Sequence, residues 1–477
     1  MFKCIYTFGE YLTKWMEAHS YTCAYLSEIT HQKSQTTVSR LMHDQCTPQR
    51  CAVFISELMT ALPNLDENEL KDFRESVDVS RYGKGRYLSY QAFSNLAMPA
   101  SDASEASSVS HLPLADELFA HVGSEKTQML IIGCIEAPIL RTVKKLLAAR
   151  RDTVSAVHYY SETQFPDLTP ILTDILALLV QPNYNIISVC SDSNIYASHL
   201  VLQDALILKN SRVQKLIIPV SCKSFRVMTL PPDQDLYGFY TSVITENVTK
   251  QSSYKVYYNY EASNDYIDFV KNCLHHEQNK TIYQIKPDVG PEHIPVDILI
   301  ENFKSYEGYE GSEAIHEVEN ELLQLFEKRF HNMHYKNKPT YLFLNKTAMV
   351  NFAKSGMMID HPFCLRPFTK DERIKIFEHL IHQAQKNPYF IPLFLVNPDL
   401  HQTYSFIGFE GYGLIIYNLN TTYSLSEEFR EILLTVPELI DHYTNYAVNI
   451  LIKSASETPK ASIEYLKHLI QVVKNSD

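Results

Sequence analysis

The sequence predicts a multidomain protein with an all-α N-terminal domain, a larger α/β region built on a mostly parallel sheet, and a C-terminal α+β region. Three observations lead to this prediction. The first 62 residues space their apolar side chains as amphipathic helices do. From residue 112 onward, short apolar runs of strand length alternate with helical stretches, which is the pattern of a sheet covered by helices. A chain of 477 residues is also too long for one ordinary hydrophobic core.

The N-terminal domain, residues 1–62, is expected to contain four or five helices. The first helix has one apolar face, which consists of Phe8, Leu12, Trp15 and Met16. Hydroxyl side chains of the kind that cap helix N-termini precede the next three segments. We therefore expect helices over residues 22–30, 35–42 and 48–62, with Thr22, Ser34 and Thr47 as their caps. The last of these begins with a proline, which is favourable at the first helical position.

The helix expected over residues 35–42 follows a tight polar turn, His31–Lys33, and carries small hydrogen-bonding side chains. Val38 and Leu41 lie three residues apart and can both face the core. The amide, hydroxyl and guanidinium groups that then point outward belong to Gln35, Thr36, Ser39 and Arg40. Such groups are able to reach the base edges and phosphates of duplex DNA.

Residues 63–96 are expected to form a helical extension, and residues 97–111 a linker that contains five serines and no aromatic residue. Gly83-Lys84-Gly85 is too short for a phosphate-binding loop. We interpret it as a solvated basic turn between helices, and the alternative is that Arg81, Lys84 and Arg86 contact DNA.

Residues 112–310 are expected to form the α/β domain, which would sense an effector. Its apolar runs predict strands at residues 129–134, 154–160, 186–190 and 216–220. The stretches between them predict helices at residues 139–150, 168–180 and 194–208. Residues 311–337 are expected to form a connecting amphipathic helix. Its apolar face could be a dimer seam or could pack within its own domain.

The C-terminal α+β domain is expected to comprise residues 338–477. Strands are predicted at residues 341–344 and 391–396, and a hairpin is predicted to join residues 404–407 to residues 414–418 through three glycines. Helices are predicted at residues 369–385, 426–452 and 459–473.

The charge, the cysteine content and the length of the apolar runs predict the compartment of the protein and argue against a membrane-spanning protein. The net charge is −12, but residues 1–62 contain five bases and five acids, so the acidity lies in the rest of the chain. The nine cysteines include no Cys-x-x-Cys pair, which is typical of reduced cytoplasmic proteins. No signal-peptide pattern is present, and no apolar run is long enough to cross a membrane. We expect a cytoplasmic protein that has no membrane partner.

Ser34-x-Thr36-Thr37-Val38-Ser39-Arg40, preceded by Leu26-Ser27-Glu28, resembles the helix-turn-helix of the lambda-repressor-like XRE/Cro transcriptional regulators. The resemblance is confined to the first 62 residues. It departs from the family pattern in the turn, which is one residue longer and has His31 or Gln32 in place of the usual glycine.

The resemblance implies a role for each polar residue around the helix over residues 35–42. The implied base-contacting residues are Gln35, Thr36, Ser39 and Arg40. The implied phosphate-contacting residues are Thr22, Lys33, Thr47, Gln49 and Arg50. Two alternatives stay open. Arg40 could pair with Glu10 or Glu28 within the domain, or the helical bundle could keep this fold without binding DNA.

The sequence shows no catalytic constellation, because the common hydrolase, metalloprotease and kinase motifs are missing. Three histidine groups could each supply two metal ligands, but none has an evident third, so we expect surface histidines and no metal. These groups are His275-His276-Glu277, His331 with His334, and His379 with His382.

The sequence therefore predicts a sequence-specific, DNA-binding transcriptional regulator that is not an enzyme and needs no cofactor. Its expected partners are operator DNA with two half-sites, a second copy of the chain, and a small-molecule or protein effector. A neutral domain would bind one duplex site weakly, and such domains usually gain affinity by binding as dimers.

The alternative is a ligand-binding or enzymatic α/β protein whose N-terminal domain is only a protein-interaction module. A small-metabolite site would then lie at the carboxyl ends of the strands.

Overall fold

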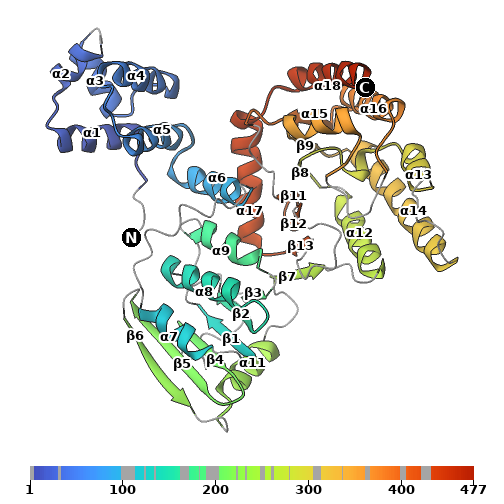
Figure 1. Ribbon diagram of the computed structural model, residues 1–477, viewed down its shortest axis with the longest axis horizontal. Coiled ribbons are helices and arrows are strands. Elements are labelled where there is room, and N and C mark those ends of the chain that lie inside the picture. The colour runs from blue at the N-terminus through green and yellow to red at the C-terminus, as the bar shows by residue number, and fades with distance from the viewer. Residues whose placement is uncertain are drawn as a thin grey trace. The chain divides into compact units, whose positions relative to one another are not determined.

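The computed structural model describes residues 5–30, 34–97, 113–122, 125–133, 136–161, 171–181, 183–189, 204–221, 224–230, 234–247, 253–258, 263–278, 280–304, 313–335, 337–359, 366–397, 404–419 and 431–476. The chain divides into two compact units, residues 1–91 and residues 92–477, which we call the helical unit and the α/β unit. Figure 1 labels their helices and strands.

The helical unit agrees closely with the sequence prediction. Its helices are α1 (Phe8–His19), α2 (Cys23–Ile29), α3 (Gln35–Met42), α4 (Pro48–Ala61) and α5 (Glu67–Tyr82), followed by α6 (Lys84–Ala97), which crosses into the α/β unit. Thr22 and Thr47 cap α2 and α4 as predicted, because their hydroxyls accept hydrogen bonds from the backbone N–H groups of Tyr25 and Arg50. Ser34 precedes α3 in an extended conformation, but its side chain makes no capping bond. The turn at residues 31–33 lies outside the described residues.

The helical extension packs into the same core as the first four helices. Phe73 of α5 is fully buried, and its ring centroid lies 5.3 Å from that of Trp15 and 4.8 Å from that of Tyr11. Gly83 ends α5 with a φ of 82°, a left-handed conformation that favours glycine, and so forms the predicted turn. The compact unit therefore extends well beyond residue 62.

The α/β unit is built on one sheet of thirteen strands, whose order is β10-β9-β8-β11-β12-β13-β7-β3-β2-β1-β4-β5-β6. β7 lies between two halves of six strands each, and only two residue pairs join it to β3. The strands are β1 (Thr127–Ile132), β2 (Val154–Ser161), β3 (Tyr184–Val189), β4 (Ala205–Lys209), β5 (Gln214–Ser221), β6 (Ser224–Leu230), β7 (Ser253–Tyr258), β8 (Ile282–Lys286), β9 (Thr340–Leu344), β10 (Phe390–Phe394), β11 (Tyr404–Phe409), β12 (Gly413–Asn418) and β13 (Glu431–Leu434).

Helices lie on both faces of this sheet. They are α7 (Pro113–His121), α8 (Ala137–Ala149), α9 (Leu172–Leu179), α11 (Leu236–Asn247), α12 (Ser263–Glu277), the short 3-10 helix η3 (Pro291–His293), α13 (Val296–Lys304), α14 (Glu313–Tyr335), α15 (Lys346–Ser355), α16 (Lys370–Lys386), α17 (Pro437–Tyr446), the π-helix η4 (Ala447–Ala455) and α18 (Pro459–Asn475). No described helix has the length and apolar character that a membrane span requires.

The prediction of a mostly parallel sheet is wrong, because the sheet is mixed. In the described residues only β1–β2, β2–β3, β8–β9 and β9–β10 pair in parallel. The eight other strand pairs are antiparallel. Several of these, such as β4–β5 and β11–β12, are joined by connections too short for a parallel crossover. β8 also pairs with β9 and β11, so the sheet joins the predicted domains 112–310 and 338–477.

Most individual strand and helix predictions are confirmed, including β1, β2, β3, β5, the β11–β12 hairpin, α14, α16 and α18. The helix predicted over residues 194–208 is wrong at its end, where residues 205–209 form β4. Residues 205–208 are all buried, and a continuous apolar run does not distinguish a buried strand from a buried helix. The helix predicted over residues 426–452 likewise contains β13 at residues 431–434, and its proper start is Pro437.

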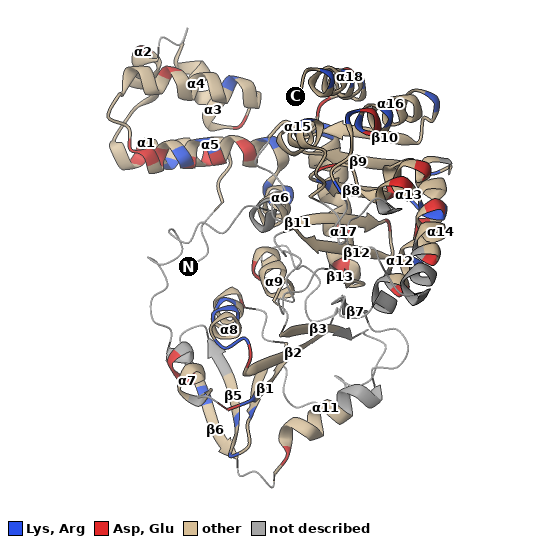
Figure 2. Ribbon diagram, turned by 45° about the vertical axis from the view of Figure 1, so that its right-hand side comes forward, with Lys and Arg blue, Asp and Glu red and all other residues tan. Residues whose placement is uncertain are grey.

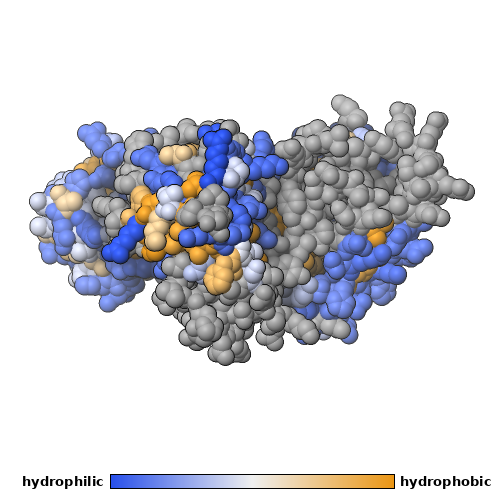
Figure 3. All heavy atoms as spheres, turned by 90° about the horizontal axis from the view of Figure 1, so that it is seen from below, coloured by the Kyte–Doolittle hydropathy of each residue, from blue (hydrophilic) through white to orange (hydrophobic). Residues whose placement is uncertain are grey.

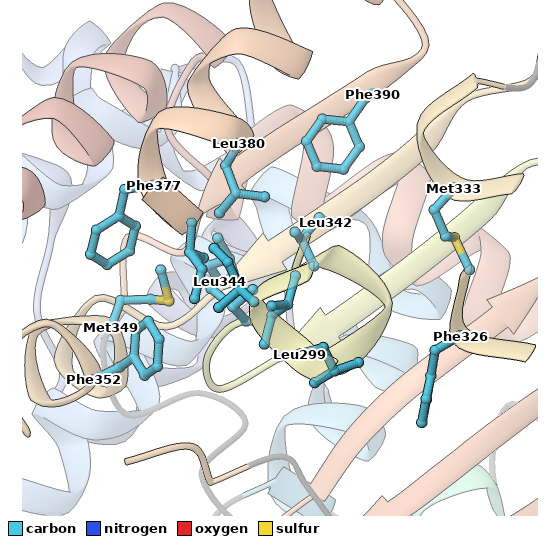
Figure 4. Packing of buried hydrophobic residues seen from close by; sticks show 14 of the residues in the cluster. Leu299, Phe326, Met333, Leu342, Leu344, Met349, Phe352, Phe377, Leu380 and Phe390 are labelled. Carbon is cyan, nitrogen blue, oxygen red and sulfur yellow. The ribbon is translucent and has the colours of Figure 1, made fainter. Parts of the chain in front are cut away.

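The largest core cluster lies under the helices that cover β8–β10. Phe326 and Met333 of α14 are each 1% exposed and belong to the same core cluster as Leu342 and Leu344 of β9 (Figure 4). Leu299 of α13 belongs to the same cluster. The second half of α14 therefore packs within its own unit. The side chains of residues 313–319 and 322 lie outside the described residues, so the dimer seam stays a prediction.

The far end of the sheet ends in the exposed edge strand β6. Val227 and Met228 of β6 and Phe239 of α11 are 36%, 51% and 60% exposed. Figure 3, which views the chain from below, shows apolar surface at the end where β6 and α11 lie in Figure 1.

Candidate nucleic-acid interface

The structure brings the four predicted base-contacting residues together on α3. Val38 and Leu41 of this helix are fully buried and fix it to the core of the helical unit. Gln35, Thr36 and Arg40 are exposed, and Ser39 is half-buried. The helix carries one cation and no acid, so its outer face presents hydrogen-bonding groups without a negative charge.

The position of α3 is fixed by a close approach to α1. A Cβ atom at Gly9 would lie 2.4 Å from the carbonyl oxygen of Met42, the last residue of α3. Asp44 adopts a left-handed φ of 53° just beyond this point. Its carboxylate accepts hydrogen bonds from the Gly9 N–H at 2.9 Å and from the hydroxyls of Thr7 and Ser80 at 2.5 and 3.2 Å. The N-terminus of α1 is therefore locked to the end of α3.

Replacing Gly9 by alanine is expected to destabilise the helical unit by about 1–3 kcal/mol, because the new methyl group would meet backbone atoms that cannot move aside. The free energy of unfolding is measured by urea titration followed through the fluorescence of Trp15, the chain's one tryptophan. Gly85→Ala is the matched control. Nothing lies within 4 Å of a Cβ atom there, and alanine favours a helix, so stability should hold or rise slightly. Equal effects of the two substitutions would contradict the close approach.

The predicted phosphate-contacting residues lie at the N-termini of α2 and α4. Thr22, Thr47 and Gln49 are exposed, and Arg50 is half-buried with a guanidinium nitrogen 3.9 Å from the carboxylate of Glu57. A capping hydroxyl accepts a backbone hydrogen bond and retains its own proton for donation to a phosphate oxygen. Lys33 lies outside the described residues.

Glu10, one of the two acids proposed as alternative partners of Arg40, has a different partner. Lys84 donates a hydrogen bond to Glu10 at 2.8 Å, and this bond lowers the pKa of the Glu10 carboxyl despite its partial burial. Arg81 lies 3.8 Å from Asp78, so two of the three cations near Gly83 face acids of their own unit. Within the described residues, Arg40 forms no ion pair.

The charge of the helical unit is close to neutral. Residues 1–91 contain ten bases and eleven acids, and residues 92–477 contain 33 bases and 44 acids. Figure 2 shows acidic residues along α1 and α5. This balance gives little long-range attraction to DNA, so affinity would have to come from the contacts of α3 and its neighbours.

The α/β unit contains a buried polar network that the sequence did not reveal. Lys286, at the end of β8, forms an ion pair with Glu292 of η3, with 2.9 Å between Nζ and Oε1, and both side chains are 2% exposed. Gln284 of β8 donates a hydrogen bond from its amide nitrogen to the same oxygen at 3.1 Å. Nearby, Arg329 of α14 donates to Glu277 of α12 at 2.7 Å, and both are buried.

Two histidines extend this network, and their hydrogen bonds determine which ring nitrogen of each carries the proton. The Gln284 amide oxygen faces His293 and lies 2.6 Å from its Nε2 atom, so Nε2 must carry a proton. The Nδ1 atom of neutral His293 then accepts from Nε2 of His334, at 3.3 Å. His334 Nδ1 is left as a buried lone pair that has no hydrogen-bond partner among the described residues.

Burial keeps these histidines neutral. Burial lowers the pKa of His293 to about 3, against the attraction of Glu292, and holds the pKa of His334 well below its usual range. Burial also lowers the pKa of His379 of α16 to about 4. Burial would raise the pKa of Glu292, but the charges of Lys286 and Arg329 outweigh it and hold that pKa far below its usual range.

The network does not form an active site or a metal centre in the described residues. Lys286, Glu292, His293 and His334 are all 0–2% exposed, so a substrate has no access to them. No cluster of three or more histidine, cysteine or acidic side chains in the described part of the chain could hold a metal ion. The expectation of surface histidines is wrong for His334, which is fully buried because its ring packs against His293 of η3, His379 of α16 and Phe390 of β10.

The other histidines of the three groups that could supply metal ligands occupy different environments. His275, His331 and His382 are exposed as expected. His276 is half-buried and stacks on Tyr412, and Glu277 binds Arg329.

Comparison with known proteins does not identify a family. No protein-family model matches the chain, and no curated protein matches it. Among solved structures, it is similar to a phosphatidylserine synthase from Haemophilus influenzae Rd KW20, with 7% identity and a TM-score of 0.25 over 76% of this chain and 90% of that one. It is also similar to a polyphosphate kinase from Porphyromonas gingivalis, with 8% identity and a TM-score of 0.23 over 75% of this chain and 51% of that one. Likenesses this weak carry no argument about the activity of this chain.

Proposed function

We propose that the chain is a DNA-binding transcriptional regulator whose helix α3 enters the major groove of duplex DNA. The observation that supports this proposal is the outer face of α3, where Gln35, Thr36 and Arg40 are exposed while Val38 and Leu41 anchor the opposite face in the core. A helix anchored in this way presents its polar side chains in a fixed geometry, which base recognition requires.

Each exposed group on α3 has a matching group on DNA. The Gln35 amide can form two hydrogen bonds with adenine, and the Arg40 guanidinium can do the same with guanine. Thr36 and Ser39 supply hydroxyl groups near the same base edges. The N-termini of α2 and α4, with Thr22 and Thr47, would hold the phosphates on either side because helix N-termini attract anions.

The proposal includes a second copy of the chain. A near-neutral unit that reads one half-site binds DNA weakly, whereas two copies with their reading helices about 34 Å apart would span successive major grooves. The α/β unit would favour one arrangement of the two copies when its effector binds, and DNA affinity would follow from that preference.

The proposal is tested by measuring the fluorescence anisotropy of labelled duplex DNA, from the region upstream of the chain's own gene, against the full chain over a salt series. Loss of two base contacts at about 1–3 kcal/mol each predicts that Gln35→Ala/Arg40→Ala binds at least about 30-fold more weakly. Arg74→Ala, which removes an exposed cation from α5, is the matched control and should bind as the wild type does.

Equal and weak binding by the wild type and the double variant would contradict the proposal. That result would favour the alternative, in which the α/β unit carries the function and the helical unit serves only to contact another protein. An unchanged unfolding transition of Trp15 confirms that the variants remain folded.

A further inference from the structure

A pocket of about 520 Å³ lies at the edge of the sheet where the parallel strands β1, β2 and β3 begin. Four segments line it: residues 126–128 at the start of β1, residues 151–155 before and within β2, residue 183 before β3, and residues 209–211 at the end of β4. β4 runs antiparallel to β1, which brings its last residue to this edge.

Most of the residues that line this pocket have polar side chains, and together they carry more positive than negative charge. Lys126, Arg151 and Lys209 are its cations, and Asp152 is its one acid. All but one of the remaining lining residues have a hydroxyl or amide side chain, and the exception is Val154. This balance is opposite to that of the α/β unit as a whole, in which acids exceed bases by eleven.

Hydrogen bonds hold the walls of the pocket in place. The amide nitrogen of Asn183 donates to the carbonyl oxygens of Leu147, Arg151 and Val154 at 3.2, 3.3 and 2.8 Å. The Thr127 N–H donates to the carbonyl oxygen of Thr153 at 2.7 Å. These bonds fix the turn that carries Arg151 and Asp152 against the start of β1.

The opposite wall is fixed by a second set of contacts. The side-chain oxygen of Asn210 accepts from the N–H groups of Arg212 and Val213, both at 2.9 Å, and so closes the turn after β4. Asp235 holds the Lys209 ammonium group at 2.8 Å. The turns before β2 and after β4 are therefore held in place by hydrogen bonds, and one of the three cations of the pocket, Lys209, is paired with Asp235.

We propose that this pocket binds a small phosphorylated molecule, between a sugar phosphate and a mononucleotide in size. Ammonium and guanidinium groups bind phosphate through charge-assisted hydrogen bonds, and the hydroxyl and amide groups suit the polar body of such a ligand. The volume lies within the range of small-molecule sites. This inference does not rest on DNA binding.

The test is isothermal titration calorimetry of the full chain with ribose 5-phosphate and with adenosine monophosphate, and ribose and citrate serve as the reference ligands. We expect saturable binding of at least one phosphate ester, no binding of ribose, and weaker binding of citrate. Lys126→Gln/Arg151→Gln should reduce the affinity at least about tenfold, because it removes two charge-assisted hydrogen bonds. Arg212→Gln is the matched control. Arg212 has an 82% exposed side chain on the same edge, pairs with Glu125 and does not line the pocket, so its replacement should leave the affinity unchanged.

Three results would overturn the inference. They are the absence of saturable binding of both phosphate esters, binding of citrate as tight as that of the better phosphate ester, and an equal loss of affinity in the control variant. The titration contains no DNA, so its failure is distinct from a failure of DNA binding. The melting temperature of each variant verifies that the fold is intact.

Discussion

Replacing Glu292 by leucine is expected to destabilise the α/β unit by about 3–5 kcal/mol, because it removes the carboxylate that lies 2.9 Å from the buried Lys286 ammonium group. Gln284 loses the acceptor of its amide N–H in the same step. The free energy of unfolding is obtained from urea titrations followed by far-ultraviolet circular dichroism. This is a large effect for one substitution, and its cause is desolvation of a charge.

The double variant Lys286→Met/Glu292→Leu removes both charges of the buried ion pair, whereas Glu292→Leu removes only the negative one. Comparing the two shows how much of the destabilisation comes from the remaining Lys286 charge. Apolar side chains of similar size replace a buried ion pair at little net cost, so the double variant should recover most of the stability. Glu464→Leu is the control, because Glu464 pairs with Lys467 on the surface of α18, where the pair contributes at most about 0.5 kcal/mol. A Glu292→Leu variant as stable as the control would contradict a charged, buried pair.

Mild acid is expected to destabilise the α/β unit through its buried histidines. Burial lowers the pKa of His158 of β2 to about 4 and that of His293 to about 3. In the unfolded chain both return to about 6.5. Between these values the unfolded chain binds more protons, so stability is complete above about pH 6.5 and is lost as the pH falls. The two groups together predict a loss of about 2–3 kcal/mol per pH unit between about pH 6 and pH 5.

A histidine variant shows whether this loss comes from the named groups. His158 donates from Nε2 to the Gly133 carbonyl oxygen at 2.6 Å and accepts at Nδ1 from the Tyr184 hydroxyl at 2.6 Å, so its neutral form is fully satisfied. His158→Gln removes one titrating group and should reduce the slope of stability against pH by about 1 kcal/mol per pH unit. Replacing the exposed His382 by glutamine should leave the slope unchanged. A slope that His158→Gln does not alter would exclude this histidine as a cause.

The sequence was sufficient for the helical unit because its signals are local. Thr22 and Thr47 precede helices that begin within one residue of the prediction, and the apolar spacing of Val38 and Leu41 identified the buried face of α3. The same local signals identified Gln35, Thr36 and Arg40 as exposed. The packing of Phe73 into this core was not predictable, because it depends on a contact 58 residues away along the chain, with Trp15.

Most of the features that could not be predicted from the sequence depend on contacts between residues far apart along the chain. The strands β4 and β13 are short, buried apolar runs whose neighbours in the sheet, and not their own periodicity, determine their structure. The buried network joins Glu277, Gln284, Glu292 and His293 to α14, and a lysine or glutamate in the sequence gives no sign that it will be buried. The pocket at the start of β1, β2 and β3 is lined by four separate segments, and none of them carries a motif.

The most direct test of the central proposal is selection of binding sites from a random duplex library by the full chain and, in parallel, by Gln35→Ala/Arg40→Ala. We expect the wild type to enrich one motif, with two half-sites about one helical turn apart, and the double variant not to enrich it. Enrichment of the same motif by both proteins, or of none by the wild type, would contradict a sequence-reading role for α3.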